Sequence, residues 1–266
     1  MKTGPYTIWV YWPNRQEDAH ACATRLARTF EDLVVANSAF SQWYRKADKL
    51  ADAFRPFCAM PPQIEELAKI FQKGQHRKDV PPDPWPELGY SVYAWNGISD
   101  ARGLWFHAHV GSYDDSRVFP NIMTIDVRSY SPENADLIDA GTLRAALMAV
   151  VTAWDGAWGC VDSALYTKRI YEGKSFARGQ PAPPPFRSGW MIYLSAPLAA
   201  NIAPPSEAIV EVRPKGGLLM RATDDVFSVE NPSHLAAADA IQRALEPLQF
   251  DPRVLDAQIA QRRLGL

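Results

Sequence analysis

Two histidines separated by a single residue form the arrangement in this chain with the clearest potential for chemistry. His107 and His109 would lie on the same side of a β-strand, because side chains alternate between the two faces of a strand. Asp114 and Asp115 follow shortly after them. Imidazole nitrogens and carboxylate oxygens are ligands of zinc and similar metals. The pattern permits a small metal-dependent hydrolase, but it lacks a further ligand at a recognised spacing and equally fits the exposed, polar face of an edge strand.

Other catalytic patterns are missing from the sequence. It contains no Gly-x-Ser-x-Gly nucleophile elbow, Walker loop, dinucleotide fingerprint or His-Glu-x-x-His zinc helix. The remaining histidines, His20, His76 and His234, are isolated. An isolated histidine is more often a satisfied surface or core residue than a catalyst. We therefore expect a protein without enzymatic activity, metal or cofactor.

The composition indicates a globular protein with a large apolar core. Of the 266 residues, 47% are hydrophobic and 22% are charged, which suffices for one large domain. Cys22, Cys58 and Cys160 are far apart and odd in number, so we interpret them as small buried apolar residues rather than as a disulfide or zinc framework. The sequence shows neither a membrane-spanning run nor an export signal, which predicts a cytoplasmic protein.

The periodicity of the apolar residues predicts the elements that position these groups. A long amphipathic helix is expected over 15–35, capped by Asn14, with further helices over 63–71, 143–154 and 232–248. Strands are expected over 6–12, 91–95, 104–111, 121–127, 158–164, 190–195, 208–212 and 217–222. The strands cluster without strand-helix-strand alternation. We therefore predict an α+β fold, with a mainly antiparallel sheet packed with long amphipathic helices, in a single domain over residues 1–266. Residues 173–188 are expected to form a proline-rich loop or extended arm within it.

Negative charge is concentrated in the middle of the chain. Residues 79–139 contain ten acidic side chains and three arginines, whereas residues 1–78 contain twelve basic and eight acidic side chains. An acidic segment repels the phosphates of nucleic acid and attracts basic proteins. The charge pattern therefore favours a protein partner over nucleic acid, although a solvated surface without a partner would have the same pattern.

A segment of mixed charge and aromatic residues, which begins at Gly74, resembles a known family motif. It runs from Gly74-Gln75-His76-Arg77-Lys78-Asp79-Val80 through Glu87-Leu88-Gly89-Tyr90 to Ala94-Trp95-Asn96-Gly97. Several shorter motifs occur around it, namely Tyr11-Trp12, Cys22-Ala23-x-Arg25-Leu26, Trp43-Tyr44-Arg45-Lys46, Ala153-Trp154-Asp155-x-x-Trp158-Gly159, Ser188-Gly189-Trp190-x-x-Tyr193-Leu194-Ser195 and Pro232-x-His234. In this order they resemble the immunity protein 52 family, bacterial proteins that neutralise polymorphic toxins with a restriction-endonuclease-like domain of the Tox-REase type.

The resemblance implies a cytoplasmic inhibitor that acts by tight association with a cognate nuclease toxin. Acids of the middle segment would then pair with basic groups of the toxin's substrate groove, and aromatic side chains would slow its release. The residues expected to contact the toxin are Asp83, Trp85, Glu87, Trp95, Asp100, Asp114 and Asp115. Neither nucleic acid nor a membrane is an expected partner. The alternatives are the metal-dependent hydrolase built on His107 and His109, and a secretion-system adaptor that docks through the proline-rich arm.

Overall fold

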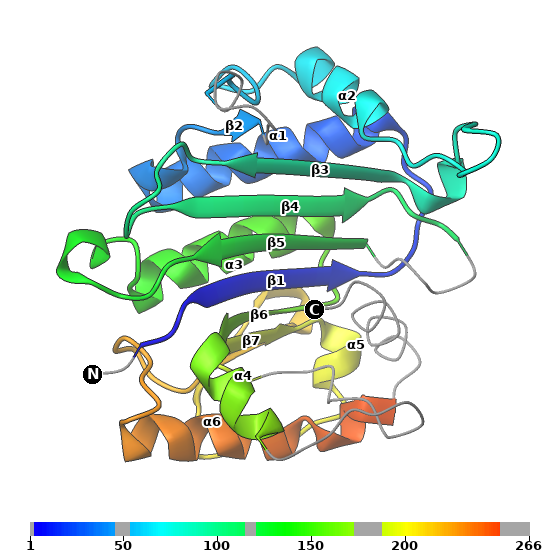
Figure 1. Cartoon of the computed structure of the whole chain (residues 1–266). Coiled ribbons are helices and arrows are strands. Elements are labelled where there is room, and N and C mark those ends of the chain that lie inside the picture. The colour runs from blue at the N-terminus through cyan, green and yellow to red at the C-terminus, as the bar shows by residue number, and fades with distance from the viewer. Residues whose placement is uncertain (1–2, 46–53, 115–120, 173–187, 251–266) are drawn as a thin grey trace.

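The computed structural model describes residues 3–45, 54–114, 121–172 and 188–250, and within them it has the α+β architecture that the sequence predicts (Figure 1). The strands are β1 (Tyr6–Trp12), β2 (Tyr44–Arg45), β3 (Tyr90–Trp95), β4 (Leu104–Val110), β5 (Asn121–Val127), β6 (Trp158–Ser163), β7 (Met191–Leu194), β8 (Ile209–Val212) and β9 (Leu218–Arg221). The α-helices are α1 (Ala19–Ala36), α2 (Ile64–Lys73), α3 (Ala140–Trp154), α4 (Ala164–Tyr171), α5 (Ala196–Ala199) and α6 (Pro232–Ala244). Short 3-10 helices include Pro86–Leu88, just before β3.

One antiparallel sheet runs through the described part of the chain. Its nine strands lie in the order β2-β3-β4-β5-β1-β6-β7-β9-β8, and every pairing is antiparallel. The first strand of the sequence is therefore the central one, paired with β5 on one side and β6 on the other. The prediction of a mainly antiparallel sheet is confirmed, but the sequence pattern alone did not reveal the central place of β1.

The two halves of the sheet are covered differently. Along β6 every residue is buried, and the neighbouring strands β7 and β9 are almost completely buried as well, so helices and loops cover both faces there. In β3 and in the first part of β4, buried and more exposed residues alternate, as in a sheet that packs on one face only. Figure 1 shows α1 and α3 behind β3, β4, β5 and β1, while the opposite face of these strands is turned toward the viewer.

The first helix begins later than the sequence predicts. Asn14 does not cap it; its side-chain amide donates a hydrogen bond to the carbonyl of Asp114 at 2.8 Å. The N-cap is Asp18, whose carboxylate accepts the Ala21 N–H at 2.8 Å. The residues before Asp18 stay extended because the Arg15 N–H binds the Ser112 carbonyl instead of starting a helical turn.

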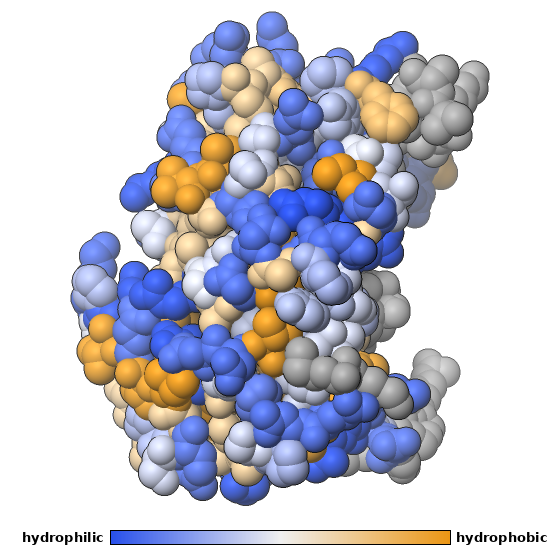
Figure 2. Space-filling model, turned by 90° about the vertical axis from the view of Figure 1, so that its left-hand side faces the viewer, coloured by the Kyte–Doolittle hydropathy of each residue, from blue (hydrophilic) through white to orange (hydrophobic). Residues whose placement is uncertain are grey.

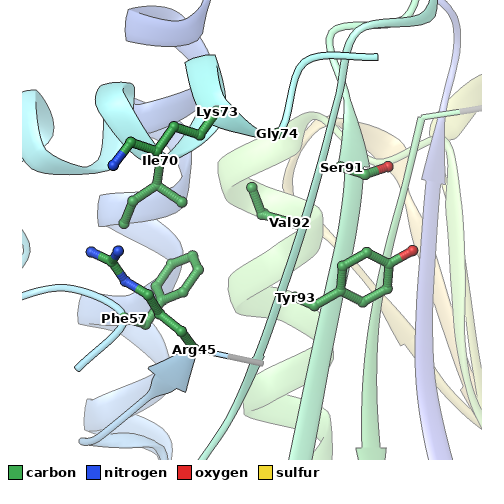
Figure 3. Close-up of a pocket in the computed structure, with 8 residues that line it drawn as sticks. All are labelled: Arg45, Phe57, Ile70, Lys73, Gly74, Ser91, Val92 and Tyr93. Carbon is green, nitrogen blue, oxygen red and sulfur yellow. The ribbon is translucent and has the colours of Figure 1, made fainter. Parts of the chain in front are cut away.

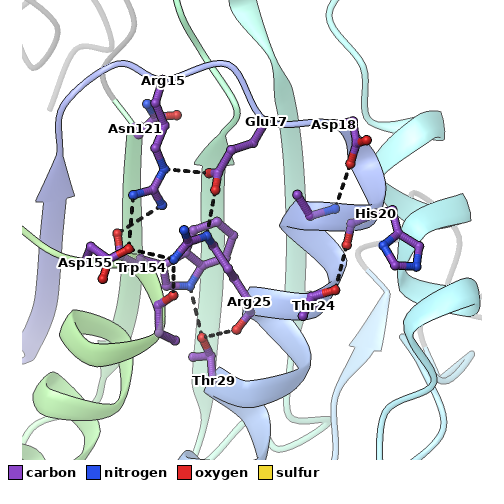
Figure 4. Close-up of polar contacts among 12 residues, drawn as sticks. Arg15, Glu17, Asp18, His20, Thr24, Arg25, Thr29, Asn121, Trp154 and Asp155 are labelled. Carbon is purple, nitrogen blue, oxygen red and sulfur yellow. Dashed lines mark hydrogen bonds and ion pairs between the residues drawn. The ribbon is translucent and has the colours of Figure 1, made fainter.

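A cluster of charged residues fastens the start of α1 to the end of α3 (Figure 4). Glu17 accepts from Arg15 at 2.9 Å and from Arg25 at 2.6 Å. The guanidinium of Arg25 also binds Asp155 at 2.9 Å and donates to the Ala153 carbonyl at 2.7 Å. Arg25 and Asp155 both belong to the motifs that carry the family resemblance, and their role here is to hold two core helices together.

Among the strands and α-helices of the described residues, three were not predicted from the sequence. These are β2, which has two residues, and the helices α4 and α5. The closing helix α6 ends at Ala244, before the predicted end at 248, and a short 3-10 helix follows it. The predicted proline-rich loop lies outside the described residues except for Ser188. In the part of the chain that the structure describes, no helix has the length and apolarity needed to cross a membrane.

Candidate partner-binding surface

The predicted contact residues fall into two groups at opposite ends of β3. Asp83, Trp85, Glu87 and Asp114 lie where β3 begins and β4 ends, and we call this group the acidic end. The N–H groups of Tyr113 and Asp114 both donate to the Glu87 carbonyl, at 2.9 and 3.1 Å, which joins the two loops. Asp83 and Glu87 are exposed, and Trp85 has 37% of its surface exposed. Asp115 lies outside the described residues.

Trp95 and Asp100 belong to the other end of the strand. Trp95 is the last residue of β3, and Asp100 lies in the loop that leads to β4, where its carboxylate accepts the Arg102 N–H at 3.0 Å. A six-residue strand with a rise of about 3.4 Å per residue separates the two groups by roughly 20 Å. The structure therefore does not bring the predicted contact residues together into one site.

Some acidic side chains of the middle segment form hydrogen bonds with other groups of the same protein. Asp136 accepts two hydrogen bonds from Arg102, at 2.6 and 3.1 Å, and these bonds lower the pKa of Asp136 to about 2. Asp139 caps α3 through a bond from the Thr142 N–H at 3.0 Å. The negative charge that the segment offers to a partner is therefore smaller than the sequence count suggests, and among the predicted residues it is concentrated at the acidic end.

Aromatic side chains gather on the open face of the sheet where β2, β3 and β4 meet. We call this group the aromatic patch, and it consists of Tyr44, Phe54, Tyr93, Trp95, Trp105 and His107. Tyr44, Trp95 and Trp105 occupy directly opposite positions on the three strands. Phe54 lies against both Trp95 and Tyr44, with ring centroids 5.5 and 5.8 Å away. Cross-strand neighbours of this kind contact each other on one face of a sheet.

Several of these rings are held in place while they remain accessible. Tyr93 stacks on His107 with a centroid distance of 4.2 Å and an interplanar angle of 4°. The guanidinium of Arg128 lies over the Trp105 ring at 4.2 Å, a cation–π contact. Nevertheless 55% of the surface of Phe54, 47% of Tyr93 and 36% of Trp105 is exposed. Figure 2, which views the molecule from the end where β3 finishes, shows separate hydrophobic clusters within a mainly hydrophilic surface.

A cleft opens beside the aromatic patch, between α2 and the edge of β3 (Figure 3). We call it the α2–β3 cleft. Its volume is about 370 Å³, and it is lined by Arg45, Phe57, Ile70, Lys73, Gly74, Ser91, Val92 and Tyr93. Figure 3 shows Phe57, Ile70 and Val92 turned toward the space, whereas the side chain of Tyr93 points to the other side of the strand. Two exposed cations, Arg45 and Lys73, flank this apolar interior.

His107 and His109, the two histidines with the spacing of metal ligands, both make contacts with neighbouring residues of the fold. β4 lies between β3 and β5, so the expectation of an edge strand is wrong. His109 is buried, and its Nε2 lies 2.8 Å from the Leu88 carbonyl, so Nε2 carries the proton because a carbonyl only accepts. His107 is stacked on Tyr93. In the described residues no group of three or more histidine, cysteine or acidic side chains is placed to hold a metal ion.

His76, which is isolated in the sequence, contacts Ser91 and His109 in the fold. Its Nε2 lies 2.9 Å from the Ser91 hydroxyl, and its ring meets that of His109 edge to face at 5.0 Å. The sequence gives no direct signal for this pairing, because it depends on where the chain after α2 crosses the start of β3. Burial, with a smaller effect from His109, lowers the pKa of His76 to about 4.

This lowered pKa predicts a loss of stability in mild acid. His76 is neutral in the folded protein down to about pH 4 but takes up a proton near pH 6.5 once unfolded. The unfolded state therefore binds more protons between these values, and the free energy of unfolding falls as the pH falls through this window. We expect a loss of about 1 kcal/mol, since the site is partly exposed and solvent screens the effect. Urea unfolding of the wild type and of His76→Gln at pH 7.5 and 4.5 measures this loss of stability. An equal loss in both proteins would contradict its assignment to His76.

Comparisons with known proteins place the whole described fold in one family. A family model described as immunity protein 52 matches residues 4–249. Among solved structures, a T6SS protein of Pseudomonas aeruginosa, PA0821, is similar to the chain, with a TM-score of 0.54 and 13% sequence identity. The similarity covers 97% of this chain and 82% of that one, and at this identity it supports the fold alone. No curated protein matches the chain.

Proposed function

The chain belongs to the immunity protein 52 family, and on that basis we propose that it neutralises a cognate toxin by stoichiometric association, without chemistry of its own. The family match over residues 4–249 is the observation that carries the proposal. The surface supports it, because Trp, Tyr and Arg dominate the energetic centres of protein interfaces, and these residue types meet on the open face of the sheet.

The toxin that we propose is a restriction-endonuclease-like nuclease, met in the cytoplasm after delivery by a secretion system. The resemblance to immunity proteins of Tox-REase toxins supports the nuclease, and the route of delivery is proposed because the protein with the similar fold is described as a T6SS protein. A nuclease presents cations along its substrate groove. The exposed acids Asp83 and Glu87 at the acidic end are complementary to such a groove. Complementary charge would accelerate the encounter of the two proteins.

Co-expression with a candidate toxin encoded next to the gene for this chain tests the proposal. We expect the chain to restore growth of cells that express the active toxin, and to co-purify in a 1:1 ratio with a catalytically inactive toxin. The inactive toxin separates binding from protection, because it can be produced without killing the host. Failure of both rescue and co-purification, with folded protein present, would refute the proposed function. Rescue without a stable complex would instead indicate that the chain acts on the toxin or its products by chemistry.

A further inference from the structure

We propose that the aromatic patch and the α2–β3 cleft together anchor the toxin, and that the cleft receives a toxin segment with a carboxylate next to an apolar side chain. This inference rests on the proposed function and names the surface and the chemistry of the contact. It differs from the expectation drawn from charge alone, which placed most contacts among the acids of the middle segment.

The first argument is the unusual composition of the open face of the sheet. The solvent face of an antiparallel sheet is normally polar, and a small isolated hydrophobic residue on a surface needs no explanation. Here Trp95 and Trp105 lie directly opposite each other on β3 and β4, and Tyr93 and Phe54 expose about half of their surfaces. Contiguous aromatic rings on an accessible face are the residues that a partner would bury with the largest gain.

The second argument is that these rings are already ordered. Tyr93 is stacked on His107 at 4.2 Å, and Trp105 lies beneath the Arg128 guanidinium at 4.2 Å. Fixing a mobile side chain on binding costs conformational entropy, and rings that are held before binding avoid most of this cost. The patch therefore offers a preformed surface.

The third argument is the chemistry of the cleft beside the patch. Phe57, Ile70 and Val92 form its apolar interior, while Arg45 and Lys73 flank it. A carboxylate would satisfy these cations, and the aliphatic or aromatic part of the same segment would cover the apolar interior. Tyr93 borders the cleft, while its ring belongs to the patch on the other side of the strand, so a partner that covers this edge of β3 can contact both. The acidic end, roughly 20 Å away along β3, would then steer the encounter rather than anchor the complex.

Binding of the catalytically inactive toxin to variants of the patch tests the anchor. We expect Tyr93→Ala and Trp105→Ala each to raise the Kd about 10-fold and the double variant about 100-fold, mainly through faster dissociation. The matched control is Val212→Ala on β8, where 75% of the residue is exposed, and its Kd should change less than 2-fold. A double variant that stays folded and binds within 3-fold of the wild type would overturn the proposal. If Tyr93→Ala and Trp105→Ala disturb folding, Trp105→Phe and Tyr93→Leu provide milder tests of the same contacts.

Charge variants test the chemistry of the cleft. We expect Arg45→Gln and Lys73→Gln each to weaken binding of the inactive toxin about 5-fold to 10-fold, and Lys69→Gln, on the same helix but outside the cleft lining, to have less than 2-fold effect. Unchanged binding by both cleft variants would refute the carboxylate. Tight binding of a single-stranded oligonucleotide, lost in the same variants, would show a nucleic-acid site and overturn the inference. Wild-type protein that fails to bind toxin would count against the proposed function itself.

Discussion

Replacement of Trp154 by alanine is expected to lower the free energy of unfolding by about 4 kcal/mol, the range for a fully buried tryptophan. Trp154 is the last residue of α3 and is completely buried. Its ring stacks on Trp12 of the central strand at 4.8 Å, and its indole N–H donates to the Thr29 hydroxyl of α1 at 3.0 Å. One side chain thus joins the central strand and both long helices, and alanine would leave a cavity where they meet.

Urea unfolding distinguishes this central role from that of other tryptophans. A shift of the transition midpoint at unchanged slope would report a loss of native-state stability. Trp154→Phe keeps an aromatic ring but loses the bond to Thr29, so we expect an intermediate loss of about 2 kcal/mol. The control is Trp85→Ala, with 37% of the residue exposed in the native protein, for which we expect about 0.5 kcal/mol. Equal losses for Trp154→Ala and Trp85→Ala would contradict the packing account.

The sequence pattern predicts most of the long elements because their apolar periodicity is strong. The strand over 6–12 and the first long helix have buried positions at the expected spacing. The two-residue strand β2 is too short to show any period. Helix α4 follows β6 without an intervening turn signal, since Ser163 ends the strand and Ala164 begins the helix. The pairing of β1 with β6 joins residues far apart in the chain, which local patterns cannot reveal.

The candidate surface was also only partly predictable, because local sequence patterns do not show which residues of neighbouring strands lie opposite each other. The alternation along β4 placed His107 and His109 on the same side of the strand, and the structure confirms this, with Trp105 on that side too. That alternation does not say which residues of β3 lie opposite them, so the pairing of Trp95 with Trp105 was not foreseen. Charge counting grouped Asp83 with Asp100 because both lie in one acidic segment, although a whole strand separates them. Arg128 and the cleft were missed, because both depend on the packing of distant segments.

The motifs that carry the family resemblance include residues that hold the core together. Trp154 and Trp190 are completely buried, and Arg25 binds Glu17 and Asp155 within the cluster that fastens α1 to α3. Of the aromatic patch, Phe54, Trp105 and His107 lie outside the motifs, whereas Tyr44 and Trp95 lie within them. The motifs therefore contain residues of the core and residues of the candidate surface.

Replacement of Gly89 by alanine is expected to lower the free energy of unfolding by about 3 kcal/mol. Gly89 joins the 3-10 helix Pro86–Leu88 to β3. Its backbone has a φ of 66° and a ψ of −138°, a conformation that residues other than glycine rarely adopt. A Cβ at this position would lie 2.2 Å from the Val110 carbonyl oxygen. That oxygen belongs to the neighbouring strand, so the collision cannot be relieved by rotating a side chain.

Substitution of a second glycine, Gly216, distinguishes the free-energy cost of the backbone conformation from the cost of the steric collision. Gly216 has a φ of 80°, but a Cβ there would meet only the Ala196 side chain, at 3.3 Å. Gly216→Ala therefore tests the conformation alone, and we expect it to cost about 1 kcal/mol. Thermal unfolding should show a melting temperature several degrees lower for Gly89→Ala than for Gly216→Ala.

Gly89→Ala should also change the kinetics of toxin binding. Because the Glu87 carbonyl holds the loop of Asp114, we expect slower association with the toxin. Dissociation, which the aromatic patch governs, should stay close to the wild-type rate. A large change in dissociation with normal association would instead assign the anchoring role to the acidic end.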